Sequence, residues 1–183
     1  RHFLTELSEG MRWMWQHKII LRFALILGIL NALEIAAHPK IEGFVLGTND
    51  LAKDLNSRTR DAMMTSLQLS LLAARAHGVV AIDGVFNAFK DEEGFAIECE
   101  QGRDLGFDGK SLIHPAQVDP CNGVFSPSDE EVRQARAIID GFALPENAGK
   151  GAIQVDGKMA ELLHLEQARR TVAIADRIGA GGG

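Results

Sequence analysis

The sequence of 183 residues has no tyrosine, two tryptophans and two cysteines. Cys99 and Cys121 form no CxxC motif and the six histidines are scattered, so the sequence contains neither a zinc-finger pattern nor a disulfide framework. Isolated cysteines are typical of reduced thiols in the cytoplasm. We therefore expect a cytoplasmic protein.

Basic residues are in deficit as well. The chain has 19 Lys and Arg against 25 Asp and Glu, which gives a net charge of −6 and an isoelectric point near 5.5. A nucleic-acid-binding surface needs basic side chains to replace the counterions of the phosphates. The charge balance therefore argues against a nucleic-acid partner. The hydrophobic fraction of 46% is enough for a globular core.

A long apolar run is also missing. The longest one, IILRFALILGIL at residues 19–30, is short for a transmembrane helix and contains Arg22. Glu6 and Glu9 precede it and no small-residue cleavage site follows it, which argues against a signal peptide. We therefore expect no membrane partner. Residues 1–30 hold both tryptophans and form an atypical N-terminal segment.

Strand and helix patterns alternate from residue 31 onward. Apolar runs predict strands at 41–47, 79–82 and 110–113. Residues 57–78 and 91–106, which lie between them, have the spacing of helices. Strands separated by helices are typical of βα units on a parallel sheet. The sequence therefore predicts an α/β protein.

The last third of the chain, residues 127–183, has a different pattern. Ser128 and Glu131 form a capping box at the start of a helix. The segment GAIQVDGKM contains an Asp-Gly turn at 156–157 between extended stretches. Residues 159–178 predict a final helix, and we expect the glycine-rich tail after it to be disordered. This region is a helical C-terminal extension.

A polar residue follows each predicted strand: Asp50 the first, Asp83 the second and His114 the third. The carboxyl ends of parallel strands meet at one edge of a sheet, where ligands bind. A site at this edge is one interpretation. Two others stay open, because Asn49 and Asp50 are also suited to capping the next helix, and a lone histidine is commonly a hydrogen-bonded structural group.

Five segments carry a resemblance to a known family. They are LNALEIAAHPKIEGFVLGTNDLAKDL, AIDGVFNAFKDEEGF, QGRDLGFDGKSLIHPAQV, FSPSDEEV and GKGAIQVDGKM. In this order, over residues 28–178, the chain resembles the HpcH/HpaI aldolase and citrate lyase β-subunit-like family. The resemblance implies that residues 31–126 are the C-terminal part of a (βα)8 TIM-type barrel, with three to four βα units, and that residues 127–183 extend it.

The resemblance also implies a metal site. Asp50 corresponds to the aspartate of the family's strand-end G-x-x-D motif, which is a Mg²⁺ ligand, and carboxylate oxygens suit this cation. The family's second metal carboxylate corresponds to Ala24, which cannot replace it. Further candidates, for substrate binding, are Gly47, Thr48, Asn49, Asp83, His114 and Pro115. The alternative for Asp83 is that it orients neighbouring loops.

A catalytic acid is the third implication of the resemblance. The family's Met-x-Asp motif supplies an acid/base that reaches the active site of a neighbouring subunit, and Glu161 stands at this position. The longer side chain keeps the carboxylate but risks misplacing it. The alternative is that Glu161 is a solvated acid in the first turn of a helix.

The implied activity is that of a Mg²⁺-dependent carbon–carbon lyase acting on a 3-hydroxyacyl-CoA thioester such as citryl-CoA or malyl-CoA, with coenzyme A as part of the substrate. Two alternatives stay open. One is a thioester hydrolase on the same scaffold. The other is a truncated, non-catalytic relative that acts through assembly, because Ala24 lacks a carboxylate and the family's earlier strands have no recognisable counterpart. A partial barrel leaves a sheet edge and apolar faces uncovered, so we expect a homo-oligomer, a trimer or hexamer.

Overall fold

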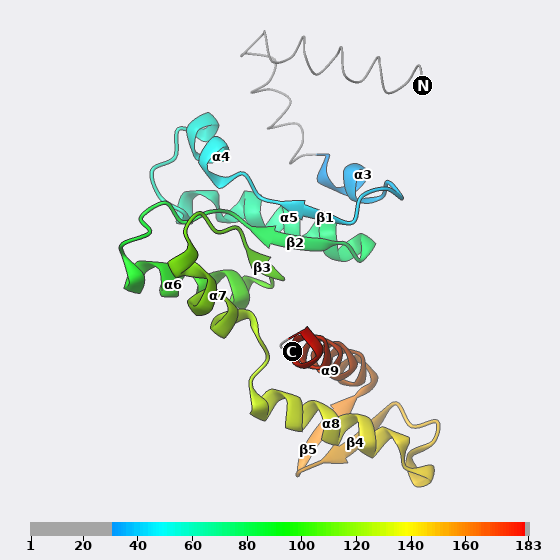
Figure 1. Cartoon of the computed structure of the whole chain (residues 1–183). Helices are drawn as coiled ribbons and strands as arrows, with labels where there is room; N and C mark the ends of the chain where they lie inside the picture. Colours follow the sequence, from blue (N-terminus) through cyan, green and yellow to red (C-terminus); the bar gives the residue numbers. More distant parts are fainter. Residues whose placement is uncertain (1–30, 182–183) are drawn as a thin grey trace. The chain divides into compact units, whose positions relative to one another are not determined.

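The computed structural model describes residues 31–181, and the chain divides between Cys121 and Asn122 into two compact units (Figure 1). The first unit contains a parallel sheet with the strand order β1-β2-β3. The predicted α/β class is confirmed. The strands are β1 Gly43–Val45, β2 Val80–Asp83 and β3 Gly109–Lys110.

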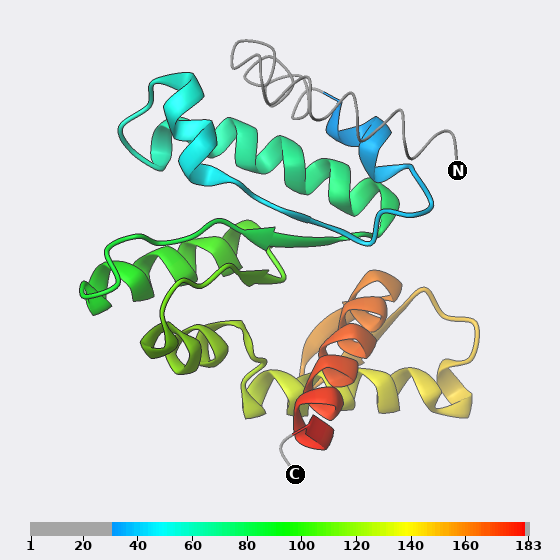
Figure 2. The same ribbon diagram turned by 45° about the horizontal axis from the view of Figure 1, so that its top comes forward.

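Helices connect these strands and lie against the sheet. Helix α5 packs on β1 and β2, α6 packs on β3, and α3 packs on α5 (Figure 2). Leu67, Ala81, Phe95 and Cys99 are among the buried residues of this core. The helices of this unit are α3 Ala32–Ala36, α4 Thr48–Leu55, α5 Met64–His77 and α6 Glu92–Leu105, with short 3-10 turns at Asp61–Met63 and Pro115–Gln117. Helix α7 Val118–Phe125 spans the boundary between the two units.

Local signals in the sequence begin and end these helices. Asp91 precedes α6 and its side chain accepts a hydrogen bond from the backbone N–H of Gly94 at 3.0 Å. Gly78 and Gly106 follow α5 and α6 with φ of 67° and 104°, a conformation that glycine adopts without steric cost. Gly78 and Gly106 are therefore the C-cap residues that end the two helices.

The third strand is shorter than predicted, because β3 ends at Lys110 rather than at residue 113. The backbone N–H groups of Ile113 and His114 donate to Oε1 of Gln117, at 3.0 and 3.2 Å, instead of to a neighbouring strand. A side chain thus satisfies the backbone groups that would have continued the sheet. The apolar pattern of residues 110–113 does not show that a side chain takes these backbone N–H groups from the sheet.

The second unit consists of two helices and a hairpin. α8 begins at the predicted capping box, in which Ser128 and Glu131 bond to each other's backbone N–H groups. The hairpin turns at Asp156 and Gly157, with φ of 50° and 77°. α9 packs along α8. The elements are α8 Asp129–Ala143, a 3-10 turn at Pro145–Asn147, β4 Ala152–Val155, β5 Lys158–Glu161 and α9 Leu162–Gly181.

Two predicted boundaries in this unit were wrong. Residues 159–161 belong to strand β5, because Ala152 to Val155 pair with residues 158–161, and the helix starts only at Leu162. At the other end, α9 continues through Gly181 into the tail that was predicted to be disordered. No proline interrupts the helix there, and glycine lowers helix stability without forbidding it. Among residues 31–181, no helix combines the length and apolar character needed to cross a bilayer.

Candidate active site

The first polar loop at the carboxyl edge of the sheet leads directly from β1 into α4. Gly47 occupies the N-cap position of α4, and no side chain caps the helix. Asp50 lies in the first turn, where the helix dipole favours a negative charge. Its side chain is exposed and makes no hydrogen bond or ion pair with any residue in the range 31–181. The capping alternative for Asp50 therefore has no hydrogen bond to support it, and the carboxylate is available to a ligand.

The loops after β1 and β2 are in close contact. Thr48 is buried, and a Cβ added to Gly84 would lie 2.1 Å from its Oγ1 and 2.7 Å from its Cβ. Real Cβ atoms do not approach other atoms this closely, so only glycine fits at position 84 while Thr48 keeps its place. The contact fixes the start of α4, and with it Asp50, against the end of β2.

Gly84→Ala is therefore expected to destabilise the protein by about 1–3 kcal/mol, because the new methyl group displaces Thr48 and the start of α4. Thermal and urea unfolding followed by circular dichroism measure the effect. Gly109→Ala, also at the sheet, is the matched control. The nearest atom to its new Cβ is Ile82 Cδ1 at 3.4 Å, so this variant should stay within about 1 kcal/mol of the wild type. Equal stabilities of the two variants would show that Gly84 is not required.

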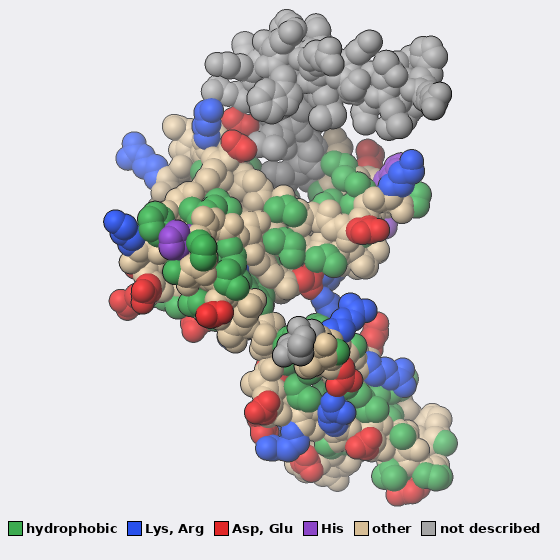
Figure 3. Space-filling view, viewed as in Figure 1, with side chains coloured by type: hydrophobic (Ala, Val, Ile, Leu, Met, Phe, Trp, Pro, Cys, Tyr) green, Lys and Arg blue, Asp and Glu red, His purple; other side chains and the backbone are tan. Residues whose placement is uncertain are grey.

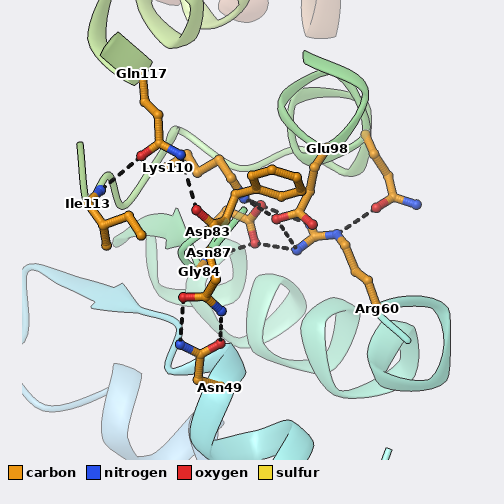
Figure 4. A network of polar contacts seen from close by, with 11 residues as sticks. Asn49, Arg60, Asp83, Gly84, Asn87, Glu98, Lys110, Ile113 and Gln117 are labelled. Atoms are coloured by element: carbon orange, nitrogen blue, oxygen red, sulfur yellow. Dashed lines mark hydrogen bonds and ion pairs between the residues drawn. The ribbon is translucent and has the colours of Figure 1, made fainter. Parts of the chain in front are cut away.

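A second link between the loops is a pair of amides. Asn49 and Asn87 each donate their side-chain N–H to the other's Oδ1, at 3.2 and 2.6 Å (Figure 4). Both residues are exposed. A reciprocal amide pair needs both side chains in one orientation, so it holds the loop after β1 in register with the loop after β2.

This amide pair lines a cavity of about 290 Å³. Arg58 also lines it, and its guanidinium makes no hydrogen bond or ion pair within the described part of the chain. The volume suits a small organic group rather than a whole cofactor, since ligand pockets usually measure about 300–1,000 Å³. The lining residues are Thr48, Asn49, Ala52, Arg58, Thr59, Arg60, Met63, Val85, Phe86, Asn87, Ala88 and Glu98.

Asp83, at the end of β2, is fully buried and saturated with hydrogen bonds (Figure 4). Oδ1 accepts from Arg60 Nη1 at 3.0 Å and from the backbone N–H of Gly84 at 2.8 Å. Oδ2 accepts from Arg60 Nη2 and Lys110 Nζ, both at 2.9 Å. The contacts match the alternative in which Asp83 orients loops, since they join β2, β3 and the segment before α5.

Glu98 completes this buried charge cluster. Its Oε1 lies 2.6 Å from Lys110 Nζ and 3.7 Å from Arg60 Nη1. The Arg60 Nε–H also donates to Gln101 Oε1 at 2.6 Å. The cluster of Arg60, Asp83, Glu98 and Lys110 thus holds equal numbers of positive and negative groups, as buried charges require. Sequence analysis did not find Arg60, Glu98 or Lys110. The sequence feature that could have pointed to this cluster was Lys110, a charged residue in a short, otherwise apolar strand pattern.

His114, at the end of the third strand pattern, has a structural contact as well. Its Nδ1 accepts the backbone N–H of Ala116 at 3.2 Å, and its ring stacks on Phe89 with 4.6 Å between the centroids. Pro115 follows as the first residue of a 3-10 turn. Gln117 Nε2 donates to the backbone oxygen of Phe86 at 3.1 Å, which ties this loop to the one after β2. All three strand-end loops therefore meet at one edge.

Glu161 lies in the second unit, as the last residue of β5. Its side chain is half-buried, and the carboxylate makes no hydrogen bond or ion pair within residues 31–181. The backbone N–H of Glu161 donates to Nδ1 of His164 at 2.9 Å. Because Glu161 precedes α9 and belongs to a strand, it is not a first-turn residue of the helix.

The two cysteines are buried free thiols that interact with each other across α6 and α7. Burial raises the pKa of the Cys99 thiol to about 12, and it raises the pKa of Cys121 as well. A thiol that stays protonated at neutral pH is a poor nucleophile. Neither cysteine is therefore a candidate for covalent catalysis.

The described residues can be compared with what a magnesium site requires. Within residues 31–181, no group of three or more His, Cys, Asp or Glu side chains could hold a metal ion. Mg²⁺ is usually bound through one or two carboxylates and completes its shell with water and substrate oxygens. The exposed carboxylate of Asp50 has the chemistry that one such position requires. Ala24, at which the resemblance implies the loss of the second carboxylate, lies outside the described residues.

Comparisons with known proteins bear on this arrangement. The profile of the HpcH/HpaI aldolase/citrate lyase family matches residues 16–115. A (3S)-malyl-CoA thioesterase of Cereibacter sphaeroides is 58% identical over 156 residues, which cover 84% of this chain and 55% of the relative. The citrate lyase subunit beta of Leuconostoc mesenteroides is 36% identical over 154 residues, covering 82% and 51%.

Among solved structures, the Mycobacterium tuberculosis protein CitE in complex with magnesium, acetoacetate and coenzyme A is similar with a TM-score of 0.62 and 29% identity. The match covers 80% of this chain and 57% of CitE. A citrate lyase from Burkholderia xenovorans reaches a TM-score of 0.68 at 20% identity, which supports the fold alone. The chain spans about half the length of the curated relatives it matches.

Proposed function

The chain belongs to the HpcH/HpaI aldolase/citrate lyase family. On this premise we propose that it acts as a hydrolase of acyl-CoA thioesters of the malyl-CoA type. The observation that carries the proposal is the 58% identity to a (3S)-malyl-CoA thioesterase over 156 residues. Relatives named citrate lyase subunit beta or citrate lyase subunit beta-like protein are less similar, at 34–37% identity. The thioesterase alternative is therefore preferred to the lyase.

The proposed site is the carboxyl edge of the parallel sheet. The three βα units are proposed to form the last part of a (βα)8 barrel, for which the likeness to CitE is the support. In such barrels the substrate lies at the carboxyl ends of the strands. Asp50 is the proposed metal ligand, and Gly47, Thr48, Asn49, His114 and Pro115 are the proposed substrate contacts. For Asp83 we propose a positioning role, since both its oxygens are taken.

Magnesium is the proposed cofactor, because CitE was crystallised with magnesium and coenzyme A. Asp50 would hold the ion, which supplies a Lewis acid for the oxygens of the acyl group. The amide pair of Asn49 and Asn87 keeps the loop of Asp50 in one position. Pre-positioning of this kind lowers the entropy lost when the substrate binds.

Glu161 is the proposed general base. In hydrolysis, a water oxygen attacks the thioester carbonyl carbon, the C–S bond breaks, and coenzyme A leaves as a thiolate that takes up a proton. The Glu161 carboxylate would accept the proton of the attacking water and return it to the leaving thiolate. Its oxygens have no partner within residues 31–181 that competes for this proton. As the resemblance implies, it would serve the site of a second copy of the chain.

Assembly into a homo-oligomer follows from the same proposal. Val45 on β1 and Val80 on β2 are 72% and 47% exposed, and hydrophobic side chains reach the surface of both units (Figure 3). Exposed apolar faces on strands are usually covered by another surface. A second copy of the chain is the proposed partner.

The proposed location is the cytoplasm. Its reducing conditions keep cysteines as free thiols, as Cys99 and Cys121 are here.

A carbon–carbon lyase is the second candidate, and the 36% identity to a citrate lyase subunit beta favours it. In that reaction the 3-hydroxyl group of malyl-CoA gives up its proton to water as the bond between C2 and C3 breaks, which yields glyoxylate and the enolate of acetyl-CoA. Protonated Glu161 would then act as the acid that donates a proton to the enolate carbon. The same residues serve both reactions, so the products decide between them.

Product analysis tests the proposal. The full chain is incubated with (3S)-malyl-CoA and Mg²⁺, free coenzyme A is measured with a thiol reagent, and malate, glyoxylate and acetyl-CoA are separated by chromatography. We expect coenzyme A and malate in equal amounts. Glyoxylate with acetyl-CoA would instead support the lyase. No turnover of malyl-CoA or citryl-CoA would overturn the proposed function in favour of a non-catalytic relative.

A further inference from the structure

The proposed reaction does not use the hydrogen bond between Glu161 and His164. Glu161 ends β5, and three residues later, in the first turn of α9, His164 turns its imidazole back toward the strand. Nδ1 of His164 accepts the backbone N–H of Glu161 at 2.9 Å. His164 is half-buried. The histidine therefore bonds the backbone of the residue proposed as the general base.

This hydrogen bond defines the state of the imidazole. A ring nitrogen that accepts a hydrogen bond carries no proton, so Nδ1 is bare and a neutral ring carries its proton on Nε2. The geometry is that of the returning half of a capping box, in which the third helical residue bonds the backbone N–H of the residue before the helix. Glutamate or glutamine usually takes this place, and here it is histidine.

Other constraints act on the backbone on either side of this hydrogen bond. Ala152 pairs with Glu161 across the hairpin, and the N–H of Leu162 donates to the backbone oxygen of Gly151 at 3.2 Å. Without His164, the Glu161 N–H would have no partner among the described residues, and the junction of β5 and α9, from which the Glu161 side chain projects, would lose a hydrogen bond.

We propose that His164 is a positioning residue that holds the backbone of Glu161 and thereby aims its carboxylate. The inference rests on the proposed function, in which Glu161 transfers a proton. Small displacements of a catalytic group are costly, since a shift of about 1 Å lowers the rate by about 100-fold. A purely structural cap would affect only stability, whereas a positioning residue affects kcat.

The test compares four single variants of the full chain, and the double variant of Glu161→Gln with His164→Ala, using (3S)-malyl-CoA and Mg²⁺. His164→Ala should lower kcat about 10-fold, with KM within about 2-fold of the wild type, because substrate binding does not involve this contact. His164→Gln, which offers an oxygen acceptor at the same helical position, should keep kcat within about 3-fold. Glu161→Gln should lower kcat strongly, and His164→Ala should add little to that loss. His77→Ala, at an exposed histidine in the last turn of α5, is the control.

Amide hydrogen exchange at Glu161 gives a readout independent of turnover. Protection in the wild type and in His164→Gln, and its loss in His164→Ala, would confirm the contact; equal exchange in all three would overturn the inference. If Glu161→Gln is inactive while His164→Ala keeps full kcat, the inference is wrong and the proposed function stands. If Glu161→Gln keeps full activity, Glu161 is not the base, and both its proposed role and that of His164 are wrong.

Discussion

Lys110→Met is expected to lower the free energy of unfolding by about 3–5 kcal/mol, because it removes the cation that bonds both the buried Asp83 and the partly buried Glu98. The Lys110 ammonium is fully buried and donates to Asp83 at 2.9 Å and to Glu98 at 2.6 Å. Arg60 would remain bound to Asp83, but it is 3.7 Å from Glu98. Since native proteins have only about 5–15 kcal/mol of stability, part of the variant is expected to be unfolded at moderate temperature.

Urea unfolding followed by circular dichroism measures this loss. Lys53→Met is the matched control, because Lys53 is exposed on α4 and makes no polar contact with the described residues. It should change stability by no more than about 0.5 kcal/mol. If Lys110→Met were as stable as this control, the charge cluster would not support the fold in the way described here.

Asp50→Asn is expected to lower thioester hydrolysis by about 100-fold or more, since even replacing the outer partners of metal ligands typically costs about 10–100-fold. The amide keeps the shape of the side chain but removes the charge that Mg²⁺ prefers. The melting temperature should hardly change, because the exposed carboxylate makes no contact within residues 31–181. Turnover of (3S)-malyl-CoA and thermal unfolding are measured on the same preparation.

Asp119→Asn is the control for this variant. Asp119 is also exposed and also lies in the first turn of a helix, α7, but away from the strand-end loop of β1. Its replacement should leave turnover unchanged. Equal activities of Asp50→Asn and the wild type would exclude Asp50 as a ligand of an essential metal ion.

Local signals in the sequence predicted a good part of this architecture. The alternation of apolar strands and helical patterns predicted the parallel sheet, and the capping box of Ser128 and Glu131 marked the start of α8. The Asp-Gly pair predicted the hairpin turn at Asp156. Each of these features depends on residues close together in the sequence. Short-range patterns therefore carry enough information to predict them.

Features that depend on distant residues could not be predicted. Arg60, Glu98 and Lys110 come from three different segments and meet only because the sheet and α6 bring them around Asp83. The early end of β3 depends on Gln117, whose side chain takes over backbone groups of the strand pattern. Asp50 was predicted as a site residue from its place after a strand, but its lack of bonding partners within residues 31–181 emerged only from the structure.

Magnesium binding tests the central claim, a metal site at Asp50, most directly. Isothermal titration calorimetry of the full chain with MgCl₂, in the presence of saturating (3S)-malate to supply chelating oxygens, should show binding of one ion per chain. Asp50→Asn should show no heat of binding under the same conditions, while Asp119→Asn binds like the wild type. Absence of binding by the wild type, or unchanged binding by Asp50→Asn, would contradict the account.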